Sequence, residues 1–232
     1  MKKLLVATAV AMTLSAAAHA ADGTAVLKLT GTLTNEPCMP TLSGGGTVDF
    51  GTKHLDELSA TDTTQLGSKD LTLSIACTAP TKMGWTIVDD RADSKAGIYV
   101  EGGWTEDDIV FGSSSSMQFG VGKTAGGVKI GSYSVSLSNT ASTADGVAMP
   151  ITYGSMGQDS LAWSDLGSTY DFVVGSGDVI YTVSDSSSNN PLAFTNAVFP
   201  LRISLAVQKT DTLAITEETP IDGQATITMV YL

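Results

Sequence analysis

The sequence closes on QATITMVYL, residues Gln224–Leu232, in which apolar and polar side chains alternate. The odd positions form one apolar face, made of Ala225, Ile227, Met229 and Tyr231. A period of two is typical of a strand that buries one face and exposes the other. We therefore predict a β-strand that runs to the end of the sequence.

A second alternating stretch lies near the other end, ADGTAVLKLTGTL at Ala21–Leu33. Its odd positions are small or apolar, and its polar residues stand at even positions. This pattern predicts an extended segment with one smooth apolar face, located before the first cysteine. As a strand, Ala21–Thr30 would span about 33 Å, enough to cover the edge of a sheet.

Between these ends, short runs of the same period are separated by clusters of Gly, Ser, Asn and Asp. They predict an all-β chain with one antiparallel sandwich domain and no convincing helix. The expected strands are Leu71–Cys77, Trp85–Val88, Met117–Val121, Val128–Leu137, Tyr170–Val174, Val179–Val183, Phe199–Gln208 and Gln224–Leu232. The expected turns or loops are Gly112–Ser116, Lys123–Gly127 and Ser184–Pro191.

The composition supports a folded protein with an acidic surface. Of 232 residues, 42% are hydrophobic and 16% charged, unlike a disordered chain. The 24 acidic residues outnumber the 12 Lys and Arg, which gives a net charge of −12. This charge repels phosphate backbones, so we expect no nucleic-acid partner.

Residues 1–20 have the features of a secretion signal. Lys2 and Lys3 precede an apolar run, Leu4–Ala18, and Ala18–Ala20 (AHA) is a small-x-small cleavage site. The apolar run is shorter than the roughly 20 residues of a membrane-spanning helix, although a retained anchor is the alternative. We expect export and a mature protein that begins at Ala21.

Export makes the two cysteines, Cys38 and Cys77, informative. An oxidising compartment favours a disulfide between them, with two buried free thiols as the alternative. Closing a loop of about 40 residues would stabilise the fold by roughly 4 kcal/mol in the chain-entropy model.

Patterns for catalysis or metal binding are weak. His54 is the only histidine after residue 20, and the sequence contains no G-x-S-x-G motif, which disfavours a serine triad. Gly122–Thr124 resembles the end of a phosphate loop, but Met117 stands where the first glycine is required. The acidic clusters Asp89–Asp93 and Glu106–Asp108 lack the spacing of an EF-hand. We expect no enzymatic activity, no metal site and no cofactor.

Several motifs, taken in order, resemble the subunits of chaperone–usher fimbriae. They are the signal peptide, the alternating extension, LTGTLTNEPC at Leu29–Cys38, the cysteine that closes an early strand, and Tyr231 next to the last residue. Within that superfamily the chain is most similar to a branch of poorly characterised fimbrial-like periplasmic proteins. The fragments that carry this similarity are VDFG (Val48–Gly51), LGSKDLTLSIAC (Leu66–Cys77), VDDR (Val88–Arg91) and FGVGKTAGGVKIG (Phe119–Gly131).

The resemblance implies an immunoglobulin-like β-sandwich over residues 35–232 that lacks its last strand, preceded by a donor segment at 21–34. In such subunits the missing strand leaves an apolar groove, which is filled first by a periplasmic chaperone and then by the extension of the next subunit at an outer-membrane usher. The implied donor positions are Gly23, Ala25, Leu27 and Leu29. The implied acceptor edge, which also meets the chaperone, is Ala225, Ile227, Met229, Tyr231 and the carboxylate of Leu232.

The chain departs from many such subunits at two points. Thr219 and not glycine stands fourteenth from the end, while Gly223 stands tenth, and the donor stretch before Gly31 is short, because Cys38 is the eighteenth residue after the expected cleavage site. The expected function is that of a structural subunit of an adhesive surface fimbria, with neighbouring subunits as partners.

Two alternative functions stay open. One is an exported carbohydrate-binding sandwich with complete sheets, in which Trp85, Trp104 and Trp163 stack on a host or surface glycan instead of filling the core. The other is a hydrolase that uses paired carboxylates.

Overall fold

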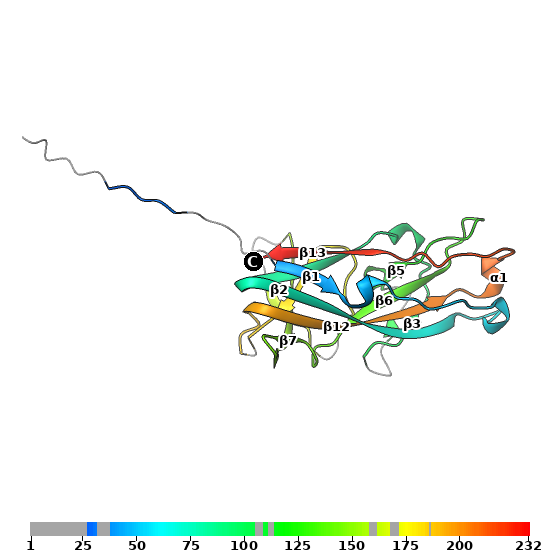
Figure 1. Cartoon of the computed structure of the whole chain (residues 1–232). Coiled ribbons are helices and arrows are strands. Elements are labelled where there is room, and N and C mark those ends of the chain that lie inside the picture. Colours follow the sequence, from blue (N-terminus) through cyan, green and yellow to red (C-terminus); the bar gives the residue numbers. More distant parts are fainter. Residues whose placement is uncertain are drawn as a thin grey trace, which may run out of the picture. The chain divides into compact units, whose positions relative to one another are not determined.

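The computed structural model describes residues 27–31, 38–104, 109–110, 114–157, 162–167, 172–185 and 187–232. Its contacts divide the chain into two parts, which meet between Asn35 and Glu36. The described residues of the first part, 27–31, have no regular secondary structure. The second part is built from β-strands, as the sequence predicts (Figure 1).

The strands are β1 (Cys38–Leu42), β2 (Thr64–Asp89), β3 (Val100–Glu101), β4 (Ile109–Val110), β5 (Phe119–Gly120), β6 (Gly131–Leu137), β7 (Thr143–Ala144), β8 (Val147–Ala148), β9 (Ile151–Ser155), β10 (Trp163–Asp165), β11 (Val179–Val183), β12 (Ala193–Val207) and β13 (Ala225–Tyr231). Helical structure in the described residues is confined to short turns: η1 (Ser43–Gly46), η2 (Leu55–Glu57), η3 (Ala92–Ser94), η4 (Ser115–Met117) and α1 (Thr210–Leu213). Over the same residues, no helix is long and apolar enough to cross a membrane.

Strand β2 organises the fold, because it contributes to both sheets. It is 26 residues long. Its first half pairs with β1 and β12, and its second half pairs with β13 and, at Trp85, with β11, always antiparallel. The predicted strands Leu71–Cys77 and Trp85–Val88 are therefore two parts of one continuous strand and not two separate strands.

The two sheets pack face to face as an immunoglobulin-like sandwich. One has the order β1-β2-β12-β6-β5 and the other β13-β2-β11-β9-β10. Trp85 is fully buried between them, with its ring centroid 5.1 Å from that of Tyr181 and 5.8 Å from that of Phe199. Odd-numbered apolar residues of β2, such as Leu73 and Ile87, point into the same core, which is the alternation that the sequence predicts.

Other predicted strands differ in extent. Only Phe119–Gly120 of Met117–Val121 is a strand, because Ser115–Met117 forms a helical turn before it. Tyr170–Val174 lies partly outside the described residues, and its Phe172 makes a single bridge to Ser136. The sequence did not predict β1 or β9, which are five residues each.

Candidate docking groove

The first and last strands of the sandwich form two edges beside β2. Strand β1 pairs with β2 from Cys38 opposite Cys77 to Leu42 opposite Leu73, and the predicted disulfide between Cys38 and Cys77 is present. Strand β13 pairs with the other half of β2, where Tyr231 lies opposite Met83. Among the described residues, β1 and β13 pair with no strand other than β2. Each of these two strands therefore has one edge paired with β2 and one edge without a neighbouring strand in the described residues.

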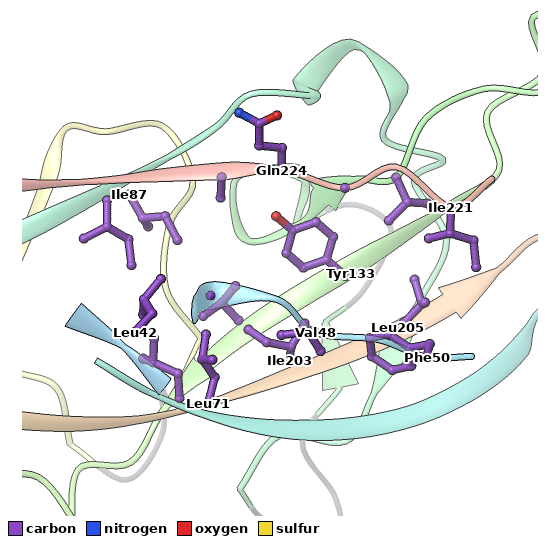
Figure 2. Close-up of a pocket in the computed structure, with 17 residues that line it drawn as sticks. Leu42, Val48, Phe50, Leu71, Ile87, Tyr133, Ile203, Leu205, Ile221 and Gln224 are labelled. Carbon is purple, nitrogen blue, oxygen red and sulfur yellow. The ribbon is translucent and has the colours of Figure 1, made fainter. Parts of the chain in front are cut away.

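An apolar groove of about 260 Å³ lies between these edges (Figure 2). Its floor comes from β2, β6 and β12, one wall from the segment after β1, and the other wall from β13 and the residues before it. The lining residues are Leu42, Gly46, Val48, Phe50, Leu71, Ile87, Val121, Tyr133, Val135, Leu201, Ile203, Leu205, Ile221, Gly223, Gln224, Ala225 and Ile227. Apart from Tyr133 and Gln224, these residues are glycines or have side chains that contain only carbon and hydrogen.

The groove continues into a second cavity of about 550 Å³. The two share Val48, Phe50 and Ile221, so they adjoin one another. The second cavity adds the apolar residues Leu58, Leu66, Ile130, Val207, Leu213 and Ile215. Charged residues also line it, among them Asp49, Glu217, Glu218 and Lys53. Together the two adjoining cavities form one largely apolar depression, and the second of them is also lined by charged side chains of both signs.

Strand β13 presents the face that the alternation predicts. Its odd residues Ala225, Ile227 and Met229 pack against the core, whereas Thr226 and Thr228 are exposed. Ala225 and Ile227 also line the groove. Two of the predicted acceptor positions therefore lie on the groove wall, and Met229 is part of the core beside it.

The last two residues, Tyr231 and Leu232, make hydrogen bonds to other strands at the far end of β13. The backbone N–H of Cys38 donates a hydrogen bond to the Tyr231 hydroxyl at 3.2 Å, and the Leu232 N–H donates to the Lys82 carbonyl at 3.1 Å. Both side chains stay partly exposed, 42% for Tyr231 and 39% for Leu232. The Tyr231 side chain thus links the last strand to the first at the disulfide.

Of the predicted donor positions, Leu27 and Leu29 are described, and Gly23 and Ala25 lie outside the described residues. The two leucine side chains are 93% and 94% exposed. Exposed large apolar side chains cost free energy in water and are typical of surfaces that bind a partner.

The VDDR motif, Val88–Arg91, fixes the wall on the β13 side. The buried Asp89 carboxylate accepts hydrogen bonds from the N–H groups of Arg91 at 2.9 Å and Gly120 at 3.0 Å. Its burial raises the pKa of the Asp89 carboxyl, against the opposing effect of these bonds and of Lys95. Next to it, Arg91 pairs with Asp222 at 2.8 Å. The residues just before β13 are therefore tied to the end of β2.

The remaining motifs are structural. Lys123 of the Gly122–Thr124 stretch pairs with Asp93 at 2.7 Å, and Thr124 N–H bonds the Val128 carbonyl at 2.8 Å, so this stretch is a hairpin turn and not a phosphate loop. His54 is exposed. Within the described residues, no three His, Cys, Asp or Glu side chains are grouped to hold a metal ion.

The tryptophans lie in different environments. Trp85 is a core residue. The Arg202 guanidinium lies 4.3 Å from the centre of the Trp104 ring, and Trp163 is partly buried on β10. Because Trp85 has no exposed surface, the three do not form one sugar-stacking platform.

The sequence reasoning missed the residues that shape the groove opposite β13, notably Val48, Phe50 and Tyr133. Val48 and Phe50 belong to the VDFG fragment, which has no alternation to reveal its role. Tyr133 lies in the predicted strand Val128–Leu137, and its position between Ser132 and Ser134 marks it as an inward residue.

Comparison with known proteins finds two full-length relatives. A family model described as "Protein of unknown function (DUF1120)" matches residues 27–134. The uncharacterized protein YhcF of Escherichia coli K12 is 31% identical over 242 residues, which cover 99% of this chain and 98% of that protein. Protein GltF of the same organism is 30% identical over 256 residues, which cover 100% of this chain and 99% of that protein.

Proposed function

We propose that this chain, which belongs to the poorly characterised family of YhcF and GltF, is a structural subunit of a surface fimbria. The subunits of this fimbria assemble by donor-strand complementation, and the fimbria supports adhesion. One observation carries the proposal: an elongated apolar groove lies between two strand edges, β1 and β13, that have no further strand neighbour in the described residues.

A strand is the ligand that suits this groove. An open strand edge offers backbone N–H and C=O groups, and the apolar floor offers positions for every second side chain of an added strand. The extension Ala21–Leu33 has that alternation, with Leu27 and Leu29 exposed in the part that is described. An extension from one copy thus supplies what the groove of another copy lacks.

The same groove needs protection before assembly. Exposed apolar surface of this kind promotes aggregation, so a periplasmic chaperone covers it and an outer-membrane usher exchanges the chaperone for the next subunit. The signal-like residues 1–20 support export to the periplasm and then to the cell surface. The chaperone contacts include the acceptor edge and the Leu232 carboxylate.

The subunit is non-catalytic. This is supported by the exposed position of His54, the structural roles of the Asp89–Arg91 motif, and the hairpin formed by Gly122–Thr124. Carbohydrate binding by a tryptophan platform has less support, because Trp85 is fully buried.

The test uses the mature chain, residues 21–232, and a fluorescent dye that binds apolar surface. The purified protein should bind the dye and form concentration-dependent polymers. A synthetic peptide of residues Ala21–Gly31, added in excess, should displace the dye and stop growth, because it fills the groove. A monodisperse monomer that unfolds cooperatively and binds no dye would indicate a complete sandwich and contradict the proposal.

A further inference from the structure

Tyr133 is the exception in the apolar floor of the groove. It lies on β6, only 9% exposed, and its ring stacks on Phe119 with 4.9 Å between ring centroids. Figure 2 shows its hydroxyl directed toward the β13 wall, beneath Gln224. Within the described residues, no hydrogen bond engages this hydroxyl, and burial raises the pKa of the phenol, which is therefore neutral and able both to donate and to accept.

The hydroxyl faces the groove and is not among the described side-chain atoms that are both buried and unpaired, so water can reach it in the free protein. An occupant that fills the groove excludes this water, and a polar group removed from water without a hydrogen bond costs free energy. The neighbouring groove residues Val121, Val135 and Ile203 have no polar side-chain atom. An occupant that displaces water from the groove can therefore take over the hydrogen bond of this hydroxyl with a polar group of its own.

The groove wall beside Tyr133 limits the size of the side chain that an occupant of the groove can place next to this ring. A Cβ atom on Gly223 would stand 3.0 Å from Cε1 of the Tyr133 ring, so the ring and the β13 wall are already close. We therefore expect an extended segment that passes this point to present a small side chain, which would also bring its backbone near the hydroxyl. In the extension, the small residues of the apolar face are Ala21, Gly23, Ala25 and Gly31.

We propose that Tyr133 is a specificity-determining residue of the groove, whose hydroxyl hydrogen-bonds the backbone of the extension of a second copy where that extension presents a small residue. This inference rests on the proposed function. The occupant is the extension of a second copy because it has the alternating apolar face and the small residues, and because its Leu27 and Leu29 are exposed.

The experiment compares Tyr133→Phe with the parent, both as mature chains that also carry Leu27→Asp to prevent assembly through their own extension. The probe is the synthetic peptide Ala21–Gly31 with the native sequence. Loss of one net hydrogen bond should weaken peptide binding by about 2- to 12-fold. The matched control is Tyr99→Phe, whose side chain is 40% exposed and lies outside the groove, and it should bind the peptide as the parent does.

A second readout separates recognition from folding. Without peptide, the Tyr133→Phe protein should unfold at the same temperature as its parent or a higher one, because the hydroxyl has no partner to lose. Equal peptide affinity of the two proteins, or a lower unfolding temperature of the free Tyr133→Phe protein, would overturn the role of Tyr133 and leave the proposed function standing. Failure of the parent to bind the peptide at all would overturn both.

Discussion

The Tyr231 hydroxyl accepts a hydrogen bond from the Cys38 backbone N–H at 3.2 Å, which joins the last strand of the sandwich to the first. The contact lies at the disulfide between Cys38 and Cys77. From this point β1 and β13 run beside different halves of β2, and the apolar groove lies between their edges. The disulfide and Tyr231 thus hold one end of the groove in place.

Replacing both cysteines with serine should lower the free energy of unfolding by roughly 4 kcal/mol, because the bond closes a loop with a sequence separation of 39. Urea unfolding of the parent and the double variant, each bound to the Ala21–Gly31 peptide, measures the difference. A parent that alkylating reagents label at both cysteines without prior reduction would show that the bond does not form.

Strand β13 offers a matched pair of substitutions at adjacent positions. Ile227→Asp would place a carboxylate among the apolar groove residues, so the unfolding temperature and the yield of folded protein should fall sharply. Thr228→Asp should have little effect, since that side chain is exposed. Circular dichroism melting curves of the two variants measure this. Equal loss in both would mean that the strand does not present the assigned face.

Gly223→Ala tests the close approach between the β13 wall and Tyr133. The added Cβ would lie 3.0 Å from the Tyr133 ring and 3.4 Å from the Gly120 carbonyl oxygen, so overpacking should cost about 1–3 kcal/mol of stability. Gly126→Ala is the control, because its Cβ would meet only the Thr124 hydroxyl at 3.7 Å. An unfolding temperature for Gly223→Ala as high as that of the control would contradict the described wall.

The ion pair between Asp70 and Arg202 predicts a pH dependence. Arg202 donates hydrogen bonds to both Asp70 oxygens, at 2.7 and 3.1 Å, and lowers the pKa of this carboxyl below its usual 3.8. A lowered pKa in the folded state stabilises the fold above the unfolded-state pKa, and this stabilisation is lost as the pH falls through the folded-state value. Because Asp70 is 60% exposed, its contribution at pH 7 should be about 1 kcal/mol or less.

The measurement for this pair is the stability difference between the parent and Asp70→Asn, from urea unfolding at several pH values. The difference should be present at pH 7 and should close below about pH 4, near the reference pKa of aspartate. A difference that stays constant down to pH 2 would show that the ionised pair does not contribute.

The sequence predicts much of this fold because strand periodicity is local. The apolar face of β13 follows from the alternation alone, and the disulfide follows from the two cysteines together with the export that residues 1–20 predict. That one strand, β2, serves both sheets cannot be predicted locally, since it depends on pairing with β12 and β11, far along the chain. The groove wall at Val48 and Phe50 was missed for a similar reason, because these residues are irregular in backbone and placed by tertiary packing.

The most direct test of the donor role is assembly of the mature chain with Leu27→Asp, compared with Thr24→Asp and the parent. Each buried leucine is worth roughly 1.5–3 kcal/mol, and an aspartate at position 27 would carry an unpaired charge into an apolar groove. Thr24 belongs to the polar face and serves as the control. The measurement is the ladder of polymers that survives in denaturing gels without boiling. We expect ladders for the parent and Thr24→Asp and none for Leu27→Asp, and a Leu27→Asp ladder equal to that of the parent would contradict the donor role.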